Sequence, residues 1–180
     1  MARTVNVGTE NLRNGALEAA PVGTKVRAVV YEIEETTVQS NAKGNAGQPQ
    51  GVVTVKILDD FVFNGSDGKP QNLKGREVRY NNVPFYKSDN AWVLAAFGAA
   101  VGWDVDSEGN VQIPETHELA QATQGKEVVV KLGIRTSQSD GRKFNTVSGW
   151  LPSGSKTSAN AGGGGAATGG GSPGEGNPWA

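Results

Sequence analysis

Apolar and polar residues alternate along most of the first 152 residues of the chain. Alternation with a period of two is typical of β-strands that bury one face. The first alternating segment is apolar on both faces over part of its length, as expected of a barrel strand with a β-bulge. In the fourth, the apolar row is Val128, Val130, Leu132 and Ile134. The pattern predicts a mainly β domain with five strands, at residues 22–38, 52–63, 76–86, 126–135 and 142–151.

One segment between the third and fourth strands breaks this alternation. Residues 90–101 carry no charge and are apolar nearly all round, which predicts a buried helix. Ser88 and Asp89 stand where an N-cap is needed, and Gly102 stands where a left-handed C-cap residue is favoured. Three strands, one helix and two strands follow the element order of a five-stranded OB-type barrel. We therefore expect the helix to fill the cavity of such a barrel.

The chain divides into a folded part and a tail. Residues 1–152 are expected to form one OB-fold domain, with residues 1–21 as an N-terminal extension. Residues 153–180 are rich in glycine, and their only bulky apolar residue is Trp179. Such a segment cannot bury enough apolar surface to offset the entropy of ordering. The sequence therefore predicts a flexible, disordered tail with Pro178 and Trp179 at its tip.

The composition narrows the classes of function. The chain has no cysteine and a single histidine, His117, so disulfides, thiolate chemistry and a serine–histidine–aspartate triad are excluded. No phosphate-binding glycine loop occurs, and we expect a non-enzymatic protein without a cofactor. No apolar run approaches the ~18 residues of a membrane span, so no membrane partner and a cytoplasmic location are expected. The formal charge of −1 means that any nucleic-acid site must come from local clustering of Lys and Arg.

Cationic and aromatic residues cluster on the expected strands and loops. Proteins hold single strands with Lys and Arg along the phosphates and aromatic faces under the bases. The alternative is that the aromatic residues are core. We assign Trp92 and Phe97 to the core, and leave Tyr80, Phe144 and Trp150 open between core and base stacking. The candidate DNA-binding residues are Arg27, Tyr31, Lys43, Lys56, Arg76, Arg79, Tyr80, Tyr86, Lys87, Lys131, Arg135, Arg142, Lys143, Phe144 and Trp150.

Four segments together carry a resemblance. They are the helix with its caps at 88–102, then 125–131, 140–147 and the Trp-Leu-Pro at 150–152. In this order they resemble phage-encoded single-stranded DNA-binding proteins of the OB-fold type, over residues 22–152. The resemblance implies sequence-independent coating of single-stranded DNA in phage DNA replication, recombination or repair. It also implies the cytoplasm of an infected bacterial host cell.

The tail extends this resemblance in part. Bacterial single-stranded DNA-binding proteins carry a Gly-rich linker with an acidic, Pro-aromatic tip that docks onto repair enzymes. Here Pro178 and Trp179 supply the Pro and the aromatic, but only Glu175 and the terminal carboxylate are acidic. The resemblance implies that the tip docks onto replication or recombination proteins. An alternative is a β-barrel interaction module, such as a phage structural or accessory protein, which the near-neutral charge favours. Whether the chain forms a homo-oligomer stays open.

An acidic stretch after the helix invites a test for calcium. Numbered from Asp104, residues 104–115 have acids at positions 1, 3, 5 and 12 and Gly109 at position 6, as in an EF-hand loop. Pro114, however, falls where the exiting helix should already run, and Glu108-Gly109 makes an ordinary hairpin turn. We predict a hairpin and no metal site, with calcium as the open alternative.

Overall fold

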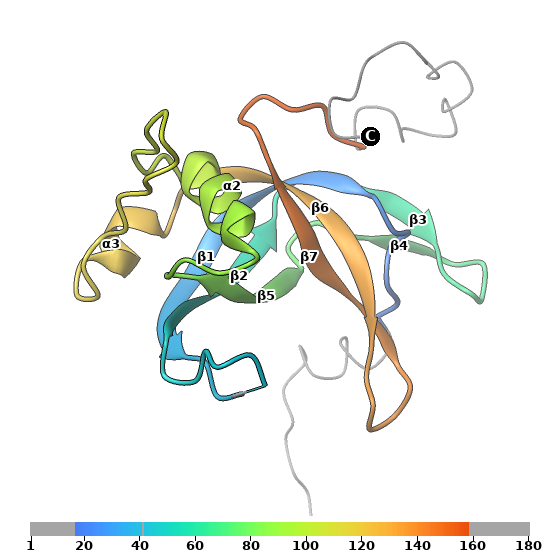
Figure 1. Cartoon of the computed structure of the whole chain (residues 1–180). Coiled ribbons are helices and arrows are strands. Elements are labelled where there is room, and N and C mark those ends of the chain that lie inside the picture. The colour runs from blue at the N-terminus through green and yellow to red at the C-terminus, as the bar shows by residue number, and fades with distance from the viewer. Residues whose placement is uncertain (1–16, 41, 159–180) are drawn as a thin grey trace, which may run out of the picture.

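The computed structural model describes residues 17–40 and 42–158, except for the side chain of Asn81. Its main feature is a five-stranded sheet in which all neighbours are antiparallel, in the order β5-β2-β1-β6-β7 (Figure 1). The mainly β expectation is confirmed. The five strands are β1 (Lys25–Thr37), β2 (Pro49–Ile57), β5 (Glu77–Pro84), β6 (Glu127–Thr136) and β7 (Lys143–Leu151).

The expectation of five strands in all was wrong, because the described residues hold seven. The expected strand over residues 52–63 ends at Ile57, and a short β3 (Val62–Asn64) pairs with β4 (Pro70–Asn72) in a separate sheet. Between them, Asp59 turns its carboxylate onto β1 and accepts hydrogen bonds from the backbone N–H and Nε of Arg27, both at 2.8 Å. These bonds hold the chain where it leaves the main sheet.

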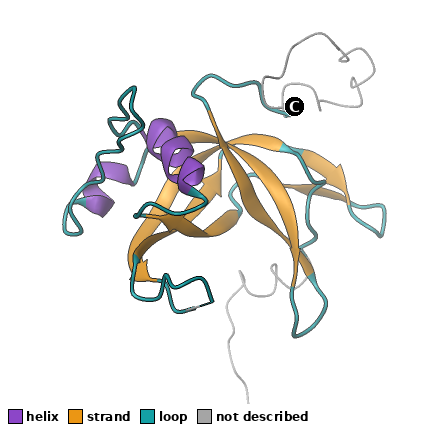
Figure 2. Ribbon diagram, viewed as in Figure 1, coloured by secondary structure: helices purple, strands orange, loops and turns teal. Residues whose placement is uncertain are grey.

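The expected bulge in β1 is present. Val26, Ala28 and Val30 are buried on one face, and the register with β2 then shifts between Val30 and Glu32. The shift returns Ile33 to the buried face, although simple alternation from Val26 would point it outward. A bulge also increases the local twist of a strand. In Figure 2 the sheet curls strongly around its core.

Curling brings the two edge strands of the sheet together. The Thr146 hydroxyl on β7 donates a hydrogen bond of 3.1 Å to the backbone oxygen of Arg79 on β5. Apolar residues of all five strands face the interior, and the core also includes Leu73, Trp103 and Leu119 from outside them. The loops between β1 and β2 and between β6 and β7 project in the same direction, toward the bottom of Figure 1.

Helix α2 (Ala91–Val101) packs against β5, β6 and β7, and a shorter α3 (Leu119–Thr123) packs against β1. The ring of Phe97 is fully buried, with its centroid 5.2 Å from that of Trp103 and 4.8 Å from that of Trp150. The prediction that Trp92 is buried was wrong: it is 63% exposed, because the core side of the helix is occupied by Val93, Leu94 and Phe97.

The caps of α2 match the sequence in part. Gly102 is the C-cap with φ of 82°, as expected. The N-cap is Asn90, which makes no side-chain capping bond, so the assignment of this role to Ser88 and Asp89 was wrong. The Ser88 hydroxyl instead accepts the Asn90 N–H at 3.2 Å, which forms a local turn before the helix.

The described chain continues to pack beyond Pro152, where the domain was expected to end. Thr157 is buried, and Ser158 pairs with the start of β1 through two bonds. The Ser158 N–H donates to the Lys25 oxygen at 2.7 Å, and the Lys25 N–H donates to the Ser158 hydroxyl at 2.8 Å. Within the described residues, no helix is long and apolar enough to cross a membrane.

Candidate nucleic-acid interface

A groove of about 720 Å³ lies where the beginning of β5 faces the turn end of the β6–β7 hairpin. Residues 75–79 form one wall, residues 135 and 142–146 form the other, and Leu17, Glu18 and Leu73 close one side. The two walls are joined by the Thr146–Arg79 hydrogen bond. Segments about 60 residues apart in sequence therefore share one concave surface.

The groove is strongly cationic in a chain whose formal charge is −1. Its lining has two acidic side chains, Glu18 and Glu77, and five cationic ones, a net charge of +3. The five cations are Arg76, Arg79, Arg135, Arg142 and Lys143, all of which were candidates from the sequence. Clustered like charges of this kind attract a polyanion at short range even when the whole chain is near neutral.

Three of these cations have no ionic partner among the residues that the structure describes. No carboxylate within that part of the chain pairs with the side chain of Arg79, Arg135 or Lys143. Arg142 differs, because its Nε lies 3.9 Å from the Asp140 carboxylate. An unpaired cation can bind a phosphate without first breaking an ion pair, so Arg79, Arg135 and Lys143 are the strongest phosphate-binding candidates.

The side chain of Arg76 holds the groove wall together through hydrogen bonds. Its Nη1 donates to the Glu18 oxygen at 2.7 Å, its Nη2 to Gln71 Oε1 at 2.8 Å and its Nε to the Asn72 oxygen at 3.1 Å. The guanidinium also lies 5.5 Å from the ring centroid of Phe63. These bonds tie the segment before β1 to β4 and β5.

Phe144 lines the groove, and Tyr80 follows the groove residue Arg79 in β5. Phe144 stands opposite Arg135 in the β6–β7 register, so the two side chains share a face, and Phe144 is 43% exposed. Tyr80 is half-buried, and its ring meets Trp150 edge to face at 5.8 Å. Burial raises the pKa of Tyr80 above its ordinary value. Both rings are accessible for contact with a base.

Trp150, which the sequence leaves open between core and base stacking, lies in the core, so its place among the DNA-binding candidates is not supported. Its side chain is only 7% exposed and is enclosed by Phe97 and Tyr80. A base could reach the indole face only by opening the core. Trp150 instead supports Tyr80 from beneath, and its buried Nε1 has no hydrogen-bond partner among the described residues.

Three candidates lie on the outer face of β1 and β2 and do not line the groove. Arg27 is bound by Asp59 at 2.8 Å and approaches Glu127 at 3.4 Å, and its bond with Asp59 is the main reason that the pKa of Arg27 is raised. Lys56 Nζ lies 4.2 Å above the Tyr31 ring and 3.9 Å from Glu77. The cations Arg27 and Lys56 are therefore already paired with carboxylates of the protein.

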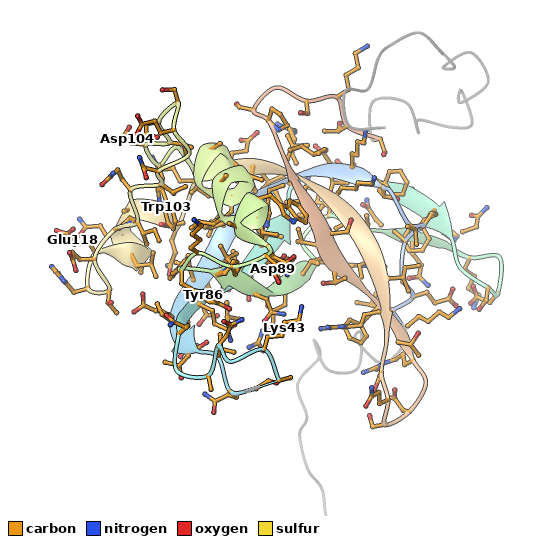
Figure 3. All side chains as sticks on the ribbon, in the orientation of Figure 1. Lys43, Tyr86, Asp89, Trp103, Asp104 and Glu118 are labelled. Carbon is orange, nitrogen blue, oxygen red and sulfur yellow. The ribbon has the colours of Figure 1, made fainter. Side chains whose placement is uncertain are left out.

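The remaining candidates are spread over other surfaces. Lys43 is exposed in the β1–β2 loop, and Tyr86 lies between β5 and α2 (Figure 3). Lys87 is exposed beside Tyr86, and Lys131 is half-buried in β6. None of these four lines the groove. Their DNA-binding roles stay predictions, and Pro178 and Trp179 fall outside the described residues.

Sequence reasoning missed several residues that shape the groove. Asn145 is one: its Oδ1 accepts the Ala20 N–H at 2.8 Å, and its Nδ2 donates to the Ala20 oxygen at 3.0 Å. Ile134, which precedes the groove residue Arg135 and does not itself line the groove, was also missed, because it was expected in the buried row of β6 but is 37% exposed. Strands β6 and β7 extend past the core at this end, so alternation continues without burial. The sequence gives no signal for either arrangement.

The acidic stretch after α2 is a hairpin, as predicted. Val105 and Val111 form an antiparallel bridge, and the Asp106 N–H donates to the Asn110 oxygen at 3.0 Å. The Asp106 carboxylate accepts the N–H groups of Glu108 and Asn110 and the Asn110 side-chain amide, which lower the pKa of Asp106. Within the described ranges, no three His, Cys, Asp or Glu side chains are grouped to hold a metal ion.

Comparison with known proteins gives one match to a family. Among curated proteins, nothing matches this chain. Residues 14–161 match the family described as "protein of unknown function (DUF669)". That span includes the groove, the helix α2 and both sheets. The chain belongs to the DUF669 family.

Proposed function

We propose that this protein binds and coats single-stranded DNA without sequence preference, through the groove between β5 and the β6–β7 hairpin. The observation that carries the proposal is the net charge of +3 in a groove that also contains the exposed ring of Phe144. A single strand offers regularly spaced phosphates and unstacked bases, which need cations and flat apolar surfaces side by side. The proposed setting is phage DNA replication, recombination or repair in the host cytoplasm.

In the proposed mechanism, Arg79, Arg135 and Lys143 bind successive phosphates. Each contact releases counterions from the DNA, which supplies most of the sequence-independent affinity. Phe144 and Tyr80 then stack on bases, at about 1–3 kcal/mol for each base. No residue reads a particular sequence in this scheme, because every base has a flat face. The protein acts by binding, and no chemical step is involved.

We propose further that the five main strands form an OB-type barrel. Three observations support this: the strand order β5-β2-β1-β6-β7, the position of α2 between β5 and β6, and the contact of the two edge strands through Thr146 and Arg79. OB-folds bind oligonucleotides on their second and third strands and on the loops after the first and fourth. In this chain the third strand is β5, and the last of these loops is 137–142, beside the groove.

The test is binding of fluorescent oligo-dT, followed by anisotropy over a range of salt concentrations. We expect log affinity to fall linearly with log salt, with a slope of about −0.7 for each phosphate neutralised, hence near −2 for three. Mixed-sequence single strands should bind with similar affinity. The interaction-module alternative predicts no binding at low salt, and an affinity that does not change with salt would also contradict the proposal.

The tail tip is proposed to dock onto a replication or recombination protein of the host. Pro178 pre-sets the backbone beside Trp179, and Trp is among the residues that most often carry interface energy. Deletion of residues 177–180 should leave the melting temperature and the oligo-dT affinity unchanged, while pull-down of such a protein from host extract is lost. If the shortened chain captures the same proteins, or loses oligo-dT affinity, the tip has another role.

A further inference from the structure

A second, smaller pocket of about 220 Å³ lies beside the main groove along the contact between β5 and β7. Its lining is Tyr80 and Asn82 from β5, Ile134 and Arg135 from β6, and Thr146 and Val147 from β7. Arg135 and Thr146 also line the main groove, so the two spaces share a boundary. A strand whose phosphates follow the groove would pass the mouth of this pocket.

Two of the lining side chains, those of Ile134 and Asn82, neither pack in the core nor hydrogen-bond to a described residue. Ile134 is 37% exposed and is not part of the core, although an apolar side chain gains free energy by burial. Asn82 is exposed, and its amide makes no hydrogen bond with any described residue. The half-buried ring of Tyr80 also lines this pocket, and its contact with Trp150 holds it in place.

This combination suits a flat ligand with apolar faces and a polar edge. A phosphate alone would gain nothing from the Ile134 side chain or the ring face of Tyr80, and an aliphatic ligand would leave the Asn82 amide unpaired. The pocket is smaller than the roughly 300–1,000 Å³ of pockets for drug-sized ligands, which favours one small ring system. A carboxamide offers both an acceptor oxygen and an NH₂ donor, so it can pair with the edge of any of the four bases.

We infer that this pocket, formed by Tyr80, Asn82 and Ile134, takes one nucleobase of the bound strand. The inference rests on the proposed function, and it adds a base-binding pocket beside the groove. Ile134 and Tyr80 contact the faces of the base, and Asn82 pairs with its edge. Arg135 at the shared boundary binds the phosphate of the same nucleotide.

The test compares oligo-dT with a base-free deoxyribose-phosphate oligomer of equal length. Removing the pocket with Asn82→Ala and Ile134→Ala together should lower oligo-dT affinity about tenfold, since stacking and edge contacts are lost. The same variant should bind the base-free oligomer as the wild type does. Lys143→Ala should weaken both oligomers by the same factor. This comparison separates base contacts from phosphate contacts, as in a double-mutant cycle.

The matched control is Val62→Ala on β3, an exposed apolar residue that lines neither cavity, which should leave both affinities unchanged. Melting temperatures check folding, and if the double variant is unstable, each single variant should give part of the base-dependent loss. Equal weakening of both oligomers, or no weakening, overturns the subsite while Lys143→Ala still supports the groove. If the wild type binds neither oligomer, the proposed function fails and the subsite fails with it.

Discussion

Replacing Arg79, Arg135 and Lys143 together with alanine should reduce oligo-dT affinity about 500-fold at about 50 mM salt. Each lost phosphate contact removes about 0.7 from the slope of log affinity against log salt, and about 0.9 log units of affinity at that concentration. These three side chains line the groove and have no ionic partner among the described residues, so their removal breaks no ion pair. Anisotropy titrations at several salt concentrations measure both quantities.

A control variant changes the charge equally on other surfaces. Lys69, Lys74 and Lys126 are exposed and line neither cavity, and of these Lys74 also pairs with Asp60 at 3.4 Å. Their replacement by alanine should leave the salt slope unchanged and reduce affinity far less, because exposed charges beyond about 10 Å are largely screened. If the two triple variants lose affinity equally, binding follows the net charge of the protein and the groove has no special role.

Phe97→Ala should lower the free energy of unfolding by about 3–5 kcal/mol, the usual cost of emptying an aromatic site in a core. The ring is fully buried between Trp103 and Trp150, so its loss leaves a cavity at the centre of the aromatic cluster. Urea denaturation followed by circular dichroism measures the change, with the slope of the unfolding transition as a check on two-state behaviour.

Trp92→Ala on the same helix is the matched control. It removes a larger side chain, but that side chain is 63% exposed, so the free energy of unfolding should change by no more than about 0.5 kcal/mol. Removal of the smaller ring, Phe97, is therefore expected to cost more unfolding free energy than removal of the larger ring, Trp92. A large loss of stability in Trp92→Ala would contradict the position of α2 against the sheet.

The strands and the helix could be predicted because their signals are local. Alternation locates β1, β6 and β7, mixed faces indicate the bulge after Val30, and Gly102 ends the helix where a positive φ is needed. The exposed face of α2 could not be predicted in the same way. A helix without polar residues has no preferred side, so its sequence does not show that Phe97 turns inward and Trp92 outward.

The groove could be predicted only as a list of residue types. Arg79 and Phe144 are far apart in the chain, and they share a surface because the sheet curls until β5 meets β7. The same curling encloses Trp150, which the sequence leaves open, and leaves Ile134 exposed, although Ile134 belongs to an apolar row. Which apolar side chains are buried and which are exposed depends on where the strands extend past the core. That is a property of the whole sheet.

The most direct test of the proposed groove is photocrosslinking with an oligonucleotide that carries 5-iodo-deoxyuridine, followed by mass spectrometry of the crosslinked peptides. Aromatic side chains that stack on bases are the expected partners of this probe. The proposal predicts adducts on Phe144 and Tyr80, with loss of the Phe144 adduct when Arg79, Arg135 and Lys143 are replaced by alanine. Adducts on Tyr31 or Trp92 instead, which lie on other surfaces, would contradict it.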